Sequence, residues 1–186
     1  MNTLPGTVLP LQNSNLRYGF ANFAPLFIAT RGLTLSQVCE IAGTELTTVQ
    51  NWIKRGWVAH PEGKRYLEPH LARILILNML RSSMQLEKIA LLLQYVNGSA
   101  ENRADDSIPD SELYSHLCMV IADVTQKGFS DTEEIRAAVN AGLTEYTEPF
   151  PGAREKLVNT LVIMTLTYIS SDYIEKAEAL FNALPL

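Results

Sequence analysis

The chain has 186 residues, 47% of them hydrophobic, and a formal net charge of −5 at pH 7. This length holds one domain, or a small domain with a second helical unit, and the hydrophobic content excludes a disordered protein. The two cysteines, Cys39 and Cys118, lie far apart, which excludes a disulfide framework or a cysteine metal pair and fits a reduced, cytoplasmic setting.

Residues 1–30 are expected to form an N-terminal arm and a packing segment. The first residues are neutral, and Pro5 and Pro10 interrupt any apolar run among them, which predicts a loose arm over residues 1–20 and argues against a secretory signal. The apolar stretch from Phe23 to Ala29 is then expected to pack onto the unit that follows.

Two short helices are predicted next. A capping-box pattern from Thr34 to Gln37 opens the first, and Gly43 ends it. A second capping-box pattern, from Thr47 to Gln50, opens another helix with Val49 and Ile53 facing inward. Two short helices joined by about four residues with a glycine are typical of a helix-turn-helix.

The segment from Gly56 to Leu67 has the composition of a turn and a short hairpin. Helices are predicted over about 69–81 and 86–95, the first of them apolar almost all round and therefore covered on more than one side. The polar and acidic residues 99–109 form the expected boundary of a first unit at 31–98.

The second unit, 110–186, is predicted to be entirely helical, with helices near 110–127, 131–143 and 151–183. The fold class expected is therefore mostly α. The apolar stretch from Leu157 to Ile169 is too short to cross a membrane and indicates a buried helix, so no membrane association is expected. An interface between subunits is the alternative use of this helix.

Charge is divided unevenly along the chain. Residues 31–81 contain seven basic and four acidic residues, a local charge of +3, whereas residues 101–155 contain twelve acidic and four basic residues, a local charge of −8. Because charges act over roughly one Debye length, about 8–10 Å, the local value governs attraction to phosphate. The first unit is therefore compatible with DNA binding despite the negative total.

The order of motifs resembles the MerR-type winged helix-turn-helix. The residues that carry this resemblance are the two short helices, Gly56-Trp57-Val58, Arg65-Tyr66 and Leu86-Glu87-Lys88-Ile89. The run from Gln50 to Gly56, followed by Lys64-Arg65-Tyr66, is similar to an uncharacterised bacterial family built on that module and described only as a domain of unknown function.

The resemblance implies a transcriptional regulator that binds double-stranded DNA as a homodimer, with the second helix in the major groove and the wing on phosphates. The residues expected at that interface are Thr47, Thr48, Gln50, Asn51, Lys54, Arg55, Lys64, Arg65 and Tyr66. The chain departs from the MerR pattern at Gln50 and Asn51, where an Arg-Tyr pair usually stands.

Several residues have a second interpretation. Gln50 is either a base contact or the far partner of the Thr47 cap, and Tyr66 either packs in the core or binds a phosphate. Trp52 and Trp57 are expected to be core anchors. The alternative function for the whole chain is a protein-interaction module that uses the same fold without touching DNA.

No catalytic function is expected, because the sequence has no phosphate-binding glycine loop and no nucleophile or metalloprotease motif. The three histidines fall at no metal-ligand spacing, so neither a metal nor a cofactor is predicted. Whether an effector binds is left open by the sequence. A pocket between the helices of the second unit would have as its lining residues Tyr114, Met119, Met164 and Tyr168.

Overall fold

The computed structural model describes residues 3–11, 15–128 and 131–184. After the 3-10 helix η2 (Leu16–Phe23) the α-helices are α1 (Ala24–Thr30), α2 (Leu35–Ala42), α3 (Leu46–Lys54), α4 (Glu68–Leu80), α5 (Leu86–Asn97), α6 (Asp110–Lys127), α7 (Thr132–Gly142) and α8 (Ala153–Asn182). Extended pairing within the described residues is limited to three isolated bridges. The prediction of a mostly α protein is confirmed.

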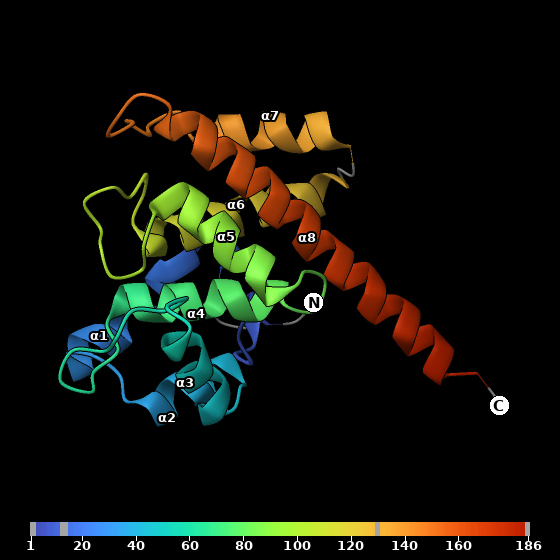
Figure 1. Ribbon diagram of the computed structural model, residues 1–186. Coiled ribbons are helices and arrows are strands. Elements are labelled where there is room, and N and C mark those ends of the chain that lie inside the picture. Colours follow the sequence, from blue (N-terminus) through green and yellow to red (C-terminus); the bar gives the residue numbers. More distant parts are fainter. Residues whose placement is uncertain (1–2, 12–14, 129–130, 185–186) are drawn as a thin grey trace.

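Helix α4 lies at the centre of the molecule (Figure 1). It contacts α2, α5, α6 and α8, and every side chain from His70 to Leu77 is buried. Helices α2 and α3 lie on one side of it, whereas α7 and the beginning of α8 lie at the opposite end of the molecule. The all-round apolar surface of this helix is therefore covered from several directions, as its sequence predicts.

From α2 onward the helix bounds follow the predictions closely, with one informative exception. Helix α2 begins at the predicted capping box, in which Thr34 Oγ1 accepts from Gln37 N–H at 3.3 Å and Gln37 Oε1 accepts from Thr34 N–H at 2.9 Å. Helix α3 instead begins at Leu46, with Glu45 as its N-cap residue and no capping side chain. The prediction of a second capping box at Thr47 is wrong, because that residue already lies inside the helix.

The prediction of a loose arm is also wrong for the described residues of the N-terminal segment. Leu4 is 2% exposed, the hydroxyl of Tyr114 donates to Pro5 O at 2.8 Å, and Val8 N–H donates to Ile41 O at 3.1 Å. Phe23 packs edge-on against Tyr114 of α6, with ring centroids 6.2 Å apart. The N-terminal residues thus join α2 to α6 instead of extending into solvent.

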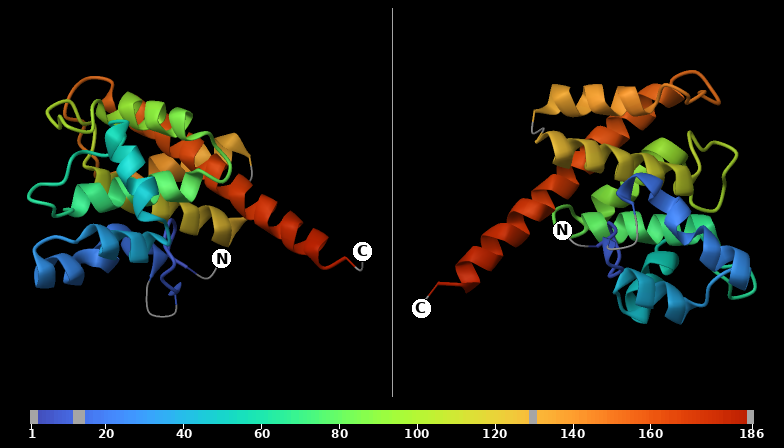
Figure 2. Two further views of the ribbon diagram at one scale, coloured as in Figure 1. Left: turned by 60° about the horizontal axis from the view of Figure 1, so that its bottom comes forward. Right: turned by 180° about the vertical axis from the view of Figure 1, so that it is seen from behind.

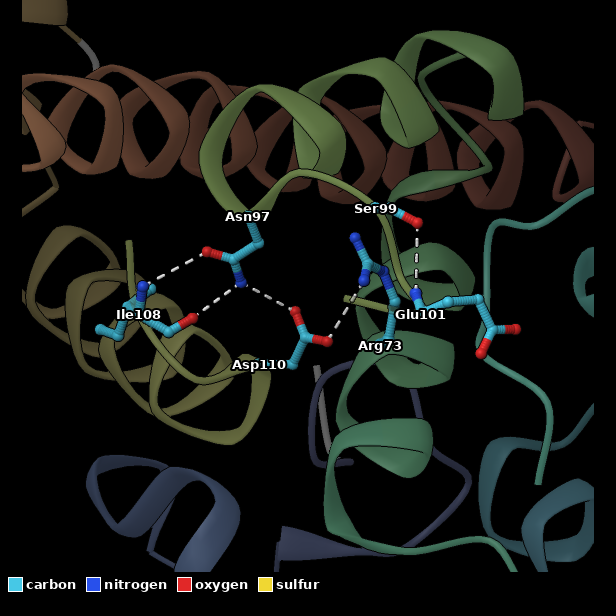
Figure 3. Close-up of polar contacts among 6 residues, drawn as sticks. All are labelled: Arg73, Asn97, Ser99, Glu101, Ile108 and Asp110. Carbon is cyan, nitrogen blue, oxygen red and sulfur yellow. Dashed lines mark hydrogen bonds and ion pairs between the residues drawn. The ribbon is translucent and has the colours of Figure 1, made fainter. Parts of the chain in front are cut away.

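A single hydrophobic core runs through both halves of the chain. A buried polar cluster crosses it between α4, α5 and the start of α6 (Figure 3). Arg73 pairs with Asp110 at 3.5 Å, and Asn97 Nδ2 donates both to Asp110 Oδ1 at 3.1 Å and to Ile108 O at 2.7 Å. These bonds hold the end of the 99–109 loop against the helices on either side.

Helix α8 has two distinct parts. Its first part lies in the core, where Leu157, Leu161 and Met164 are fully buried. The helix as a whole is long and apolar enough to cross a membrane. However, 56% of its most apolar window is buried inside the protein, as in a core helix. The second part extends away from the body of the molecule (Figure 2).

Candidate nucleic-acid interface

Helices α2 and α3 are joined by a three-residue turn, Gly43-Thr44-Glu45. Gly43 has a φ of 61°, which allows the chain to leave α2 in a left-handed conformation. A side chain there would also collide with Val8, since an added Cβ would lie 2.2 Å from Val8 Cγ1. The turn length and the glycine are those of a helix-turn-helix.

One face of α3 is buried and the other is exposed. Val49, Trp52 and Ile53 form the buried face, each at most 9% exposed. Thr47, Gln50, Asn51 and Lys54 are all exposed, and their helical spacing places them together on the opposite face. Thr48 is only partly exposed at the edge of this face. Because α3 has no capping side chain, Gln50 has no capping role.

The predicted hairpin is present as a two-residue turn. Arg65 N–H donates to Glu62 O at 2.8 Å, and the two residues between them, Gly63 and Lys64, have φ values of 54° and 62°. Two consecutive positive φ values are characteristic of a type I′ turn. Tyr66 then forms a bridge with Leu33, which directly precedes the capping residue of α2. The hairpin is therefore fastened to the start of the two-helix unit.

Arg55, Arg65 and Tyr66, which were also predicted to contact DNA, differ in how accessible their side chains are. Arg55 is exposed but pairs with Glu87 of α5 at 2.9 Å, and Arg65 is exposed while its guanidinium donates to Gly32 O at 3.3 Å. Tyr66 is 4% exposed and packs edge-on against the His70 ring. Of the two interpretations of Tyr66, the structure shows the core position, so it is not part of an accessible surface.

A contact at the base of the hairpin was not anticipated from the sequence. The carboxylate of Glu101, in the 99–109 loop, accepts from His60 N–H at 2.9 Å, and its Oε1 lies 2.7 Å from His60 Nδ1. Both hydrogen bonds lower the pKa of Glu101, and the one with the His60 side chain has the larger effect. The partners are 41 residues apart, so no local pattern indicates their contact.

The four residues named as the lining of a possible effector pocket do not form one together. Tyr114 and Met164 are fully buried and Tyr168 is 8% exposed. A cavity of about 920 Å³ lies instead between the 99–109 loop, α6 and the segment after α7, and Met119 is one of its lining residues. Asp106 and His116 also line it, and burial lowers the pKa of His116.

Residues 32–117 match the family described as "Domain of unknown function (DUF1836)". The chain is also 25% identical, over 150 residues, to the "Uncharacterized protein YkrK" of Bacillus subtilis (strain 168), a match that covers 76% of this chain. The chain spans 64% of the length of that relative. No solved structure matches the chain. The resemblance to an uncharacterised family is thus confirmed, and the matching residues run from just before α2 into α6.

Proposed function

We propose that the chain is a DNA-binding transcriptional regulator that acts as a homodimer through a MerR-like winged helix-turn-helix. In this proposal α3 enters the major groove and the turn at Gly63-Lys64 reaches the phosphate backbone. Gln50 and Asn51 are suited to adenine, and Lys54 to guanine or phosphate.

The observation that carries this proposal is the free outer face of α3. Thr47, Gln50, Asn51 and Lys54 are exposed, so no other described part of the chain covers them. The acidic helices α6 and α7 lie across α4 from α3 (Figure 1). Lys64 is exposed at the end of the hairpin, which is tied to the same unit through Leu33.

The test measures binding to a short random duplex between about 50 and 200 mM salt, because phosphate contacts release counterions and make affinity fall steeply with salt. Lys54→Ala and Lys64→Ala are each expected to weaken binding and to lower the salt slope by about one. Arg103→Ala, which removes an exposed cation in the 99–109 loop, is the matched control and should leave the slope unchanged.

Sequence preference is tested separately with Gln50→Ala and Asn51→Ala. Enrichment of genomic fragments by the wild-type protein should give one recurring sequence, and each variant should relax it at particular positions by about 1–3 kcal/mol per base pair. Absence of duplex binding at the lowest salt would contradict the proposal and would favour the protein-interaction module.

A further inference from the structure

A second cavity, of about 440 Å³, lies between the end of α3, α4, α5 and the start of the 99–109 loop. It shares no lining residue with the 920 Å³ cavity. Its lining includes two arginines, Arg55 and Arg73, together with apolar side chains such as Leu91 and Ala100. Two cations beside apolar groups in one concave site are features of a binding pocket for a small charged molecule.

Arg73 brings to this cavity a buried cation whose hydrogen bonding is incomplete. Its side chain is 6% exposed, and the hydrogen bond that it donates to Asp110 is long, at 3.5 Å. Its Nε is buried and has no hydrogen-bond partner in the described structure. Because buried donors are nearly always paired, an unpaired one points to a partner from outside the chain.

The position of the Arg73 side chain directs it toward the cavity. Figure 3 shows the guanidinium extending from α4 toward the segment that follows α5, with Asp110 on one side and Ser99 on the other. Ser99 is among the lining residues of the cavity and Asp110 is not. The guanidinium therefore lies between its carboxylate partner and the cavity.

Arg55 is the more accessible of the two cations. It directly follows α3, its guanidinium lies 4.9 Å from the centroid of the Trp57 ring, and it pairs with Glu87 at 2.9 Å. Both members of this ion pair are more than half exposed, so the pair is weak. Because Glu87 and Trp57 also line the cavity, an anion bound there can compete with Glu87 for Arg55.

The charge of the lining selects the sign of the ligand. Glu87 is the one acidic residue among the lining residues in the described part of the chain, against Arg55 and Arg73, which leaves a net charge of +1. Arginine stays protonated at every pH at which proteins fold. Its planar fork of N–H groups matches the oxygens of a carboxylate or a phosphate.

We propose that this cavity binds a small organic anion, whose carboxylate or phosphate group is held by Arg73 and Arg55 and whose apolar part lies against Trp57 and Leu91. The depth of Arg73 favours a small ligand over a duplex, in which each phosphate is flanked by two sugars. Binding would also withdraw Arg55 from the DNA contact predicted for it. This last step rests on the proposed function, whereas the anion site itself does not.

The first experiment measures anion binding without DNA, at constant ionic strength. Benzoate and phenyl phosphate present the two candidate groups on one apolar ring, and benzamide is the neutral control. The tryptophan indole N–H signals are followed by nuclear magnetic resonance: that of Trp57 should shift, whereas that of Trp52, which is not a lining residue, should not. The tighter anion identifies the group. No shift with either anion up to about 20 mM, or equal binding of benzamide, would overturn the proposal.

Three substitutions of exposed residues test the assigned charges. Arg55→Gln is expected to weaken anion binding roughly tenfold. Glu87→Gln removes the competing carboxylate and is expected to strengthen it roughly threefold. Lys88→Gln is the matched control, because Lys88 is an exposed cation on the same helix and does not line the cavity. An equal loss in Arg55→Gln and Lys88→Gln would reduce the effect to general electrostatics and overturn the site.

The buried cation needs a variant that keeps its charge. Arg73→Lys retains the ammonium charge without the planar fork, and circular dichroism establishes whether the variant is folded. A folded Arg73→Lys protein is expected to bind the anion roughly tenfold more weakly, and unchanged binding would overturn the role of Arg73. If the variant does not fold, the opposite effects of Arg55→Gln and Glu87→Gln decide the proposal.

The link to DNA is tested separately, by repeating the duplex titration with the tighter of the two anions present. Duplex binding is expected to weaken roughly threefold or more in the wild-type protein and not in Arg55→Gln, since coupling between two ligands is reciprocal. Unchanged duplex affinity would overturn this link. Anion binding by a protein that binds no duplex would overturn the proposed function and support the anion site.

Discussion

At the scale of single residues, the buried pair Arg73–Asp110 is the most consequential contact. Both side chains are less than one-tenth exposed, and Arg73 Nε has no hydrogen-bond partner in the described structure. Asp110 also accepts from Asn97 (Figure 3). A buried guanidinium that loses the carboxylate paired with it is left with a poorly compensated charge, and this is more costly than never having had the pair.

Asp110→Ala is accordingly expected to lower the free energy of unfolding by about 3 kcal/mol, as measured by urea denaturation. Asp110→Asn keeps an acceptor for Asn97 and removes only the charge, so it should be less damaging. Replacing both Arg73 and Asp110 with leucine should cost less than Asp110→Ala alone. A loss below about 1 kcal/mol in Asp110→Ala would show that the pair is not a significant buried contact.

Asp106 provides a pH-dependent test. Burial, and then the neighbouring Asp110 carboxylate, raises the pKa of Asp106 to about 6, compared with about 3.9 for an unfolded aspartate. The folded protein therefore holds more protons than the unfolded chain between these values. The stability that this group contributes is fully present below about pH 4 and is lost as the pH rises through about 6.

Asp106→Asn removes that loss. It is expected to raise the free energy of unfolding at pH 8 by about 1–2 kcal/mol, a value reduced from the full shift because the carboxyl is only partly buried, and to have little effect at pH 4. Urea denaturation at the two pH values measures the difference. An equal effect at both would mean that the carboxylate is not destabilised by its surroundings.

At the scale of secondary-structure elements, α2 and α3 present matched capping motifs of which only one is formed. Thr34 and Gln37 exchange hydrogen bonds with each other's backbone N–H at the start of α2, whereas Thr47 lies within α3 and caps nothing. Thr34→Ala should therefore cost about 1 kcal/mol of unfolding free energy. Thr47→Ala should change it by less than about 0.5 kcal/mol. Equal losses would show that α3 begins at Thr47.

At the scale of the whole molecule, one core connects the two predicted units. The polar cluster around Asp110 and the N-terminal contact between Pro5 and Tyr114 link segments more than 30 residues apart in the sequence. A continuous core of this size favours cooperative unfolding. The units expected at 31–98 and 110–186 should then lose structure together.

Both tryptophans, Trp52 and Trp57, lie in the first of these units, so their fluorescence reports on it alone. Its denaturation curve is expected to coincide with that of far-ultraviolet circular dichroism, which reports on all the helices. A fluorescence transition clearly separated from the circular dichroism transition would demonstrate two independent folding units.

The local sequence by itself determined the helices from α2 onward. Periodic apolar residues and end signals located α6 at its observed bounds and α8 to within two residues of each end, because helical hydrogen bonds join residues four apart and depend on nearby side chains. The exposed polar residues of α3 and the hairpin turn were also predictable, since amphipathic spacing and turn chemistry are local properties.

Only the tertiary structure decided which of these residues face a partner and which face the core. Tyr66 is buried beside His70, Glu101 reaches His60, and the N-terminal residues pack between α2 and α6, and each of these contacts joins segments that no local pattern relates. The same holds for the second part of α8, where Tyr173, Leu180 and Phe181 are exposed although their residue types are those of a core face. Burial depends on what folds against a surface, so long-range packing alone separates the buried half of this helix from the exposed half.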